Sequence, residues 1–163
     1  MRLRRWLFAE GDNLAGGVYG TILVTSIVAA ADTNDAIWRS FGIVVVTTFV
    51  FWLAHVYAHA LASSLDRTDE FSLGEVRRIA RHEWPLLQAA VVPSLCLAAG
   101  AVGLLERPSA YWLAIGYGVV ALLWWGLLFA RRTRLSRAAT FAVVLVNAAF
   151  GLSVVALKMF VDH

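Results

Sequence analysis

The chain has 163 residues, of which 60% are hydrophobic and only 15% are charged, and its formal net charge is +3. Its mean hydropathy of +0.71 lies far from that of an average soluble domain. This composition predicts a multi-pass membrane protein. Most of the basic residues lie outside the expected spans and on one side of the membrane, so nucleic-acid binding is not expected.

The hydrocarbon core of a bilayer is about 30 Å thick and needs about 20 apolar residues per helix. Five segments of the chain meet this requirement. They are residues 13–31, 38–63, 85–105, 109–130 and 138–161. We therefore expect an all-α membrane protein in which residues 1–163 form a single bundle of five transmembrane helices.

An arginine-rich start precedes the first expected span, which is the pattern of a secretory signal peptide. Glu10 and Asp12 argue against this interpretation. Gly16 and Gly20 form a small-xxx-small pair, which favours packing within the bundle over a dimer interface. Asp12, Gly16 and Tyr19 fall near one helical face. This face predicts a polar stripe that opens with an acidic group.

The second expected span carries the strongest functional signal. His55 and His59 lie four residues apart, so both imidazoles project from one helical face. The other polar members of this face are Thr48, Trp52, Ser63 and Asp66. Ionisable groups inside a membrane usually face a protein interior or a pathway. The stripe therefore predicts a route for water or for a small cation.

Several roles for the two histidines stay open. Imidazole exchanges protons in the physiological range and also binds divalent metals, so His55, His59 and Glu83 are candidate metal ligands, with Asp12 at the same membrane face. A structural role, in which each histidine bonds to a neighbouring helix or reaches the interface, fits the sequence equally well. Haem is not expected, because its axial ligands normally come from opposite sides.

The connection between the second and third expected spans has a helix of its own. Ser72 and Glu75 form a capping box, and the arginine-rich segment that follows predicts a short amphipathic helix at the membrane interface. His82 and Glu83 end this segment, and solvation at the surface is the favoured role for both. Pro93 is expected to kink the third span.

The remaining spans offer fewer chemical groups. Cys96 is the single cysteine, so no internal disulfide forms, and a buried apolar role is expected. Tyr111 belongs to an aromatic belt at one end of the fourth span. In the fifth span, Asn147 either joins helices or belongs to the histidine stripe, whereas Lys158 is expected to reach the interface.

The basic residues predict the orientation. All but three of the 14 precede the first span or lie between spans two and three or four and five. The exceptions are Arg39, Arg107 and Lys158. The positive-inside rule then places the N-terminus in the cytoplasm and the C-terminus outside the plasma membrane. The basic loops are also suited to anionic lipid head groups.

Two short motifs and a proline carry a family resemblance. They are Gly11-Asp12-Asn13-Leu14 in the first span, Ala54-His55-Val56-Tyr57-Ala58-His59 in the second and Pro93 in the third. With five spans and a cytoplasmic N-terminus, the whole chain distantly resembles the vacuolar iron transporter family, whose members are dimeric and exchange divalent metal for protons.

The resemblance implies that Asp12 matches the acidic position of the family's first-span motif and that Tyr57 matches the tyrosine of its Gly-Glu-Tyr motif. Val56 stands where the family has a glutamate, and the family's glutamate-rich cytoplasmic helices are reduced to one short segment. In its richness in Ala, Val, Arg and Trp the chain also resembles small multi-pass membrane proteins of actinobacteria.

An enzyme is not expected, because no phosphate-binding glycine loop, His-Glu-x-x-His motif or nucleophile with a nearby base is present. The sequence predicts a transporter or channel for a small cation, either a proton or a divalent metal, that works through the histidine stripe as a homo-oligomer in the lipid bilayer. No cofactor is expected beyond a divalent metal ion. The alternative is a non-transporting scaffold or accessory subunit whose polar residues hold helices together.

Overall fold

The computed structural model describes residues 14–33, 35–65 and 73–161. All regular secondary structure in these residues is helical. The helices are α2 (Leu14–Ala30), α3 (Ile37–Leu65), α4 (Leu73–His82), α5 (Trp84–Ala101), α6 (Arg107–Arg132) and α7 (Arg137–Val161). The all-helical expectation is confirmed for the described part of the chain.

Four of these helices, α3, α5, α6 and α7, are long and apolar enough to cross a membrane. The α2 helix is also apolar but has only 17 residues, which extend about 26 Å at 1.5 Å per residue. That length is slightly less than a hydrocarbon core of about 30 Å. The helix lengths are those of a helical membrane protein, and the fifth span stays a prediction.

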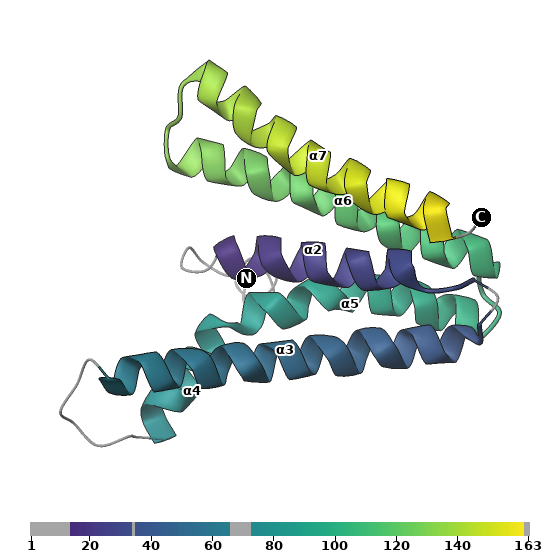
Figure 1. The fold of residues 1–163 in the computed structure, drawn as a ribbon, viewed down its shortest axis with the longest axis horizontal. Coiled ribbons are helices and arrows are strands. Elements are labelled where there is room, and N and C mark those ends of the chain that lie inside the picture. Colours follow the sequence, from purple (N-terminus) through teal and green to yellow (C-terminus); the bar gives the residue numbers. More distant parts are fainter. Residues whose placement is uncertain (1–13, 34, 66–72, 162–163) are drawn as a thin grey trace, which may run out of the picture.

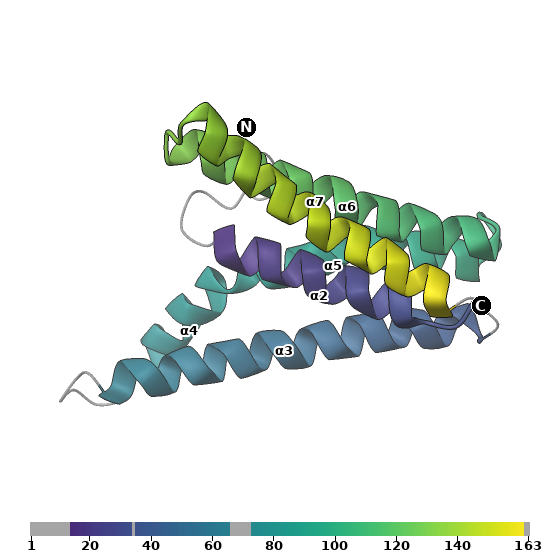
Figure 2. The same ribbon diagram turned by 45° about the horizontal axis from the view of Figure 1, so that its top comes forward.

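The α2 helix lies at the centre of the bundle, between α3 on one side and the α6–α7 hairpin on the other, and it also packs on α5 (Figures 1 and 2). Its buried face consists largely of small residues. A Cβ atom at Gly20 would lie 2.9 Å from the carbonyl oxygen of Leu86, and one at Gly17 would lie 2.8 Å from the Trp125 ring. Glycine therefore allows α5 and α6 to approach α2 closely.

The middle of the bundle is an apolar core. Its members come from all five long helices. They include Val24, Val28, Val44, Leu97, Ala114, Ile115 and Val154, none more than 3% exposed. Thr21 and Thr25 are buried beside them, and each donates its hydroxyl to a carbonyl oxygen of its own helix. These hydroxyls therefore add no hydrogen-bond donor to the core.

Because successive long helices run in opposite directions, their termini and connections gather at two opposite ends of the bundle (Figure 1). The basic end holds α4, the start of α5 and the α6–α7 turn, and the C-terminal end holds the α5–α6 connection and the end of α7. The described arginines of the basic end are Arg77, Arg78, Arg81, Arg131, Arg132, Arg134 and Arg137. At the C-terminal end Arg39 pairs with Asp35 at 2.9 Å. The two ends therefore differ sharply in charge.

The short helix α4 folds back on α3 at the basic end (Figure 1). Ile79 packs against Val56 and Ala60. The Trp52 indole Nε1 donates a hydrogen bond of 3.3 Å to the Ala80 carbonyl oxygen. A helix therefore occupies the position expected for the amphipathic segment, while residues 66–72, including Ser72 of the expected capping box, lie outside the described residues.

Candidate functional site

The polar face of α3 ends in a contact between His59 and Glu83, the residue just before α5. The His59 Nδ1 atom lies 2.9 Å from the Glu83 Oε1 atom. The Glu83 side chain is only 2% exposed, whereas the His59 side chain is 55% exposed. The expectation that Glu83 is solvated at the surface is therefore wrong.

Glu83 is buried because the chain turns between two helices at this single residue. Its backbone N–H donates to the Ile79 carbonyl oxygen at 2.9 Å, and Pro85 lies in the first turn of α5. Because α4 folds onto α3, the Glu83 side chain at the turn between α4 and α5 contacts α3. Glu83 is also the N-cap residue of α5, where the helix dipole favours a negative charge.

His55 makes different contacts from His59. Its Nδ1 atom lies 2.9 Å from the Phe51 carbonyl oxygen. A carbonyl only accepts hydrogen bonds, so Nδ1 carries the hydrogen of this bond. The His55 ring centroid lies 5.1 Å from that of Tyr19. His55 and Tyr19 thus form an aromatic contact between α3 and α2.

The other described members of the polar face bond to backbone oxygens. The Thr48 hydroxyl donates to Val44 at 2.7 Å, and the Ser63 hydroxyl donates to Ala60 at 2.9 Å. Both acceptors belong to α3 itself. The hydrogen bonds of the described polar face are therefore separate from one another and do not form a continuous chain along α3. Asp12 and Asp66, which the sequence adds to the pathway, lie outside the described residues.

The candidate metal ligands are only partly brought together. His59 and Glu83 are in contact, while His55 packs on Tyr19. Protein zinc sites use three or four side-chain ligands. In residues 14–33, 35–65 and 73–161, no group of three or more His, Cys, Asp or Glu side chains is placed to hold a metal ion. The metal hypothesis stays a prediction that needs further ligands.

Asn147 belongs to α7, and α7 and the histidine-bearing helix α3 lie on opposite sides of α2 (Figure 1). Its Nδ2 atom donates to the Val143 carbonyl oxygen of the same helix at 2.9 Å. A Cβ atom at Gly126 would lie 2.9 Å from this Nδ2 atom, so the amide packs closely on α6. The Asn147 Oδ1 atom is buried without a hydrogen-bond partner among the described residues.

The two expected packing glycines both lie on the buried face of α2. Gly20 contacts Leu86 of α5, as described above. Gly16 is buried one turn earlier in the same helix. Neither position is open for contact with a second copy of the chain in this structure.

A second polar cluster, which the sequence did not predict, lies at the C-terminal end. Lys158 is 0% exposed, and its Nζ atom donates to the Ala31 carbonyl oxygen at 2.7 Å. The same Nζ atom lies 5.0 Å from the centroid of the Tyr111 ring. The Tyr111 hydroxyl is hydrogen-bonded to the Ser40 hydroxyl at 2.6 Å. Lys158 therefore does not reach the interface, and Tyr111, also 0% exposed, is not part of an aromatic belt.

Local chemistry explains why an ammonium group is stable here. Ala31 follows the last residue of α2, where backbone carbonyls lack helical partners and the helix dipole is negative. The Tyr111 ring adds a cation–π contact. One sequence signal was available, since Gly151, Val154 and Lys158 are spaced by three and four residues and form the buried face of α7.

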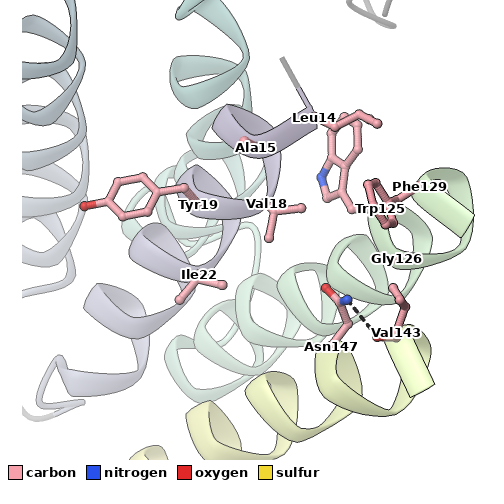
Figure 3. Close-up of a pocket in the computed structure, with 10 residues that line it drawn as sticks. All are labelled: Leu14, Ala15, Val18, Tyr19, Ile22, Trp125, Gly126, Phe129, Val143 and Asn147. Atoms are coloured by element: carbon pink, nitrogen blue, oxygen red, sulfur yellow. Dashed lines mark hydrogen bonds between the residues drawn. The ribbon is translucent and has the colours of Figure 1, made fainter. Parts of the chain in front are cut away.

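The cavities on the described part of the bundle include three of substantial size. The first, of about 560 Å³, separates α2 from the α6–α7 hairpin (Figure 3). Another of about 570 Å³ lies at the α5–α6 connection, and the last, of about 430 Å³, lies between α3 and α5. None of the three is lined by His55, His59 or Glu83.

The chain matches no protein-family model, no curated protein and no solved structure.

Proposed function

We propose that the protein is a non-transporting scaffold or accessory subunit of the plasma membrane, and that its polar side chains hold helices together. In this proposal α2 is the fifth span and α4 lies at the interface. The basic end and the N-terminus face the cytoplasm, and the C-terminus lies outside.

The observation that carries the proposal is the apolar core between the two polar clusters. His59 and Ser40 are 19 residues apart on α3, which corresponds to about 28 Å along the helix. Between them on α3, Val44 is 0% exposed and Val56 is 5% exposed, and Val24 on α2 is also fully buried. Transfer of a bare ion into so apolar a medium costs on the order of 20 kcal/mol before relaxation. A single bundle with this core is poorly suited to carry ions.

A flux measurement tests this proposal. The full-length protein is reconstituted into liposomes that contain a pH-sensitive dye, and a proton or potassium gradient is then applied. We expect dye responses equal to those of empty liposomes, and we expect the protein to co-purify with another membrane protein under mild solubilisation. Flux above that of empty liposomes would refute the scaffold proposal.

Cation transport remains a second candidate, supported by the contact between buried Glu83 and half-exposed His59. An ionisable group buried in a membrane protein often marks an ion pathway. In this alternative, a homo-oligomer supplies the missing polar volume, and the cargo is a proton or the divalent metal implied by the resemblance to iron transporters.

Matched variants distinguish this second candidate. Transport predicts that Glu83→Gln and His59→Gln each abolish flux, while His82→Gln at the same end, an exposed histidine, leaves it unchanged. For the metal version, elemental analysis of protein purified without a histidine tag should find metal that the Glu83→Gln variant loses. Equal flux in all variants would remove the pair from any mechanism.

A further inference from the structure

The groove between α2 and the α6–α7 hairpin has a largely apolar wall. Figure 3 shows α2 side chains facing side chains of the hairpin across the space, while the Tyr19 ring points away from it. The facing residues are Leu14, Val18 and Ile22 of α2 and Trp125, Phe129 and Val143 of the hairpin. Its volume of about 560 Å³ lies in the range of about 300–1,000 Å³ typical of ligand sites.

The inner end of the groove lies about one membrane leaflet from the arginines of the α6–α7 turn. The hairpin diverges from α2 toward the basic end, and the groove lies in this divergent part (Figures 1 and 2). Its deepest hairpin residue, Asn147, is ten residues from Arg137 at the start of α7, or about 15 Å along the helix. Half of a hydrocarbon core is also about 15 Å thick.

Positive charge is concentrated at the end of the groove. The sequence from Arg107 to Val161 contains no acidic residue. Four exposed arginines surround the α6–α7 turn, and none of them has an ion-pair partner in the described part of the chain. They are Arg131, Arg132, Arg134 and Arg137. The turn therefore has several unpaired guanidinium groups near the end of the apolar groove.

The backbone of this turn holds an arginine where glycine is usual. Arg134 has a φ of 51°. Its N–H bonds to Arg131 at 3.4 Å, and the Leu135 N–H bonds to Ala130 at 3.1 Å, which is the Schellman pattern with Arg134 at the C′ position. The left-handed conformation is unfavourable for a residue with a Cβ atom. A side chain kept at such a position is often a functional one.

We propose that this groove binds one acyl chain of an anionic phospholipid and that the arginines of the α6–α7 turn bind its phosphate. Guanidinium groups are well suited to phosphate, which they bind through paired hydrogen bonds. A helix of 15 Å length and 10–12 Å diameter would occupy about 1,200 Å³ or more, about twice the groove, so a partner helix fits it poorly. An extended acyl chain is much thinner than a helix and fits this volume better.

Quenching of Trp125 fluorescence tests the site. Full-length protein is reconstituted in two kinds of vesicle: brominated phosphatidylglycerol in unlabelled phosphatidylcholine, and brominated phosphatidylcholine in unlabelled phosphatidylglycerol. The protein has seven tryptophans, so the Trp125 signal is the difference between the wild type and Trp125→Phe. We expect quenching to favour phosphatidylglycerol by roughly fivefold or more in relative binding, since each arginine near the surface favours anionic lipid by about that factor.

The arginine variants decide the outcome. Arg134→Gln with Arg137→Gln should reduce the preference at least about fivefold, whereas Arg77→Gln with Arg78→Gln, on α4 at the same end, should leave it unchanged. Arg134→Gly should weaken lipid preference while raising protein stability, because glycine suits the left-handed conformation. Equal quenching by both lipids, an effect of the α4 variants as large as that of the turn variants, or protection of Trp125 by a second copy of the chain would each overturn the proposal.

Discussion

The basic end and the C-terminal end each bury a charged group, but the two groups have different surroundings. Lys158 is fully enclosed by α2 and α6, and its ammonium bonds to a helix-terminal carbonyl beneath an aromatic ring. Glu83 is equally buried, but its partner His59 is half exposed. The C-terminal cluster of Lys158, Tyr111 and Ser40 is therefore a closed cluster, buried between the helices that it joins. The His59–Glu83 pair at the basic end is an accessible pair, because solvent reaches His59.

The closed cluster gives the largest expected effect. Lys158→Ala removes a charged hydrogen bond and leaves a cavity, so we expect the free energy of unfolding in detergent to fall by about 2–4 kcal/mol. Lys158→Met keeps most of the volume and should recover part of this loss. Denaturant titration followed by circular dichroism measures both, and a Lys158→Ala variant as stable as the wild type would show that the cluster does not fasten the helices.

The core between the two clusters gives the next effect. A Cβ atom at Gly118 would lie 2.1 Å from the Thr25 Oγ1 atom, so we expect Gly118→Ala to destabilise the protein by about 1–3 kcal/mol. Gly116 is the matched control on α6, because nothing lies within 4 Å of its Cβ position. Gly116→Ala should be neutral or stabilising by up to about 1 kcal/mol. Equal effects in denaturant titrations would mean that α2 and α6 are not tightly packed.

The tyrosine of the closed cluster gives a smaller effect. Tyr111→Phe leaves the buried Ser40 hydroxyl without its partner, and we expect a loss of about 1 kcal/mol in the free energy of unfolding. Ser40→Ala should cost a similar amount. If the two hydroxyls interact, the double variant should lose less than the sum of the single variants, whereas strict additivity would contradict the hydrogen bond.

The accessible pair gives the smallest effect. Solvent screens an ion pair whose histidine is 55% exposed, so we expect His59→Gln to cost less than about 1 kcal/mol. Added salt should reduce that difference further. The comparison is made in the same denaturant titrations at low and high ionic strength. A loss as large as that of Lys158→Ala would show that the two ends are equally closed.

The sequence predicted the helices and the concentration of arginines at one end because both depend on local composition. It also placed His55 and His59 on one helical face, through simple periodicity. It failed for Glu83, whose burial depends on α4 folding back onto α3, a tertiary contact. It failed for Lys158 as well, because a position near a helix end suggests an interfacial role, and only the meeting of α2, α6 and α7 provides the enclosing partners.

The separation of the two ends by a dry core is tested most directly by cysteine labelling along α3. In a Cys96→Ala background, single cysteines replace His59 and Thr48, which is 1% exposed in the middle of the helix. Each protein is treated in liposomes with a small water-soluble thiol reagent. We predict that the cysteine at 59 reacts and that the cysteine at 48 does not. Rapid reaction at position 48 would show that water reaches the middle of the bundle, and the core between the two ends would then not be dry.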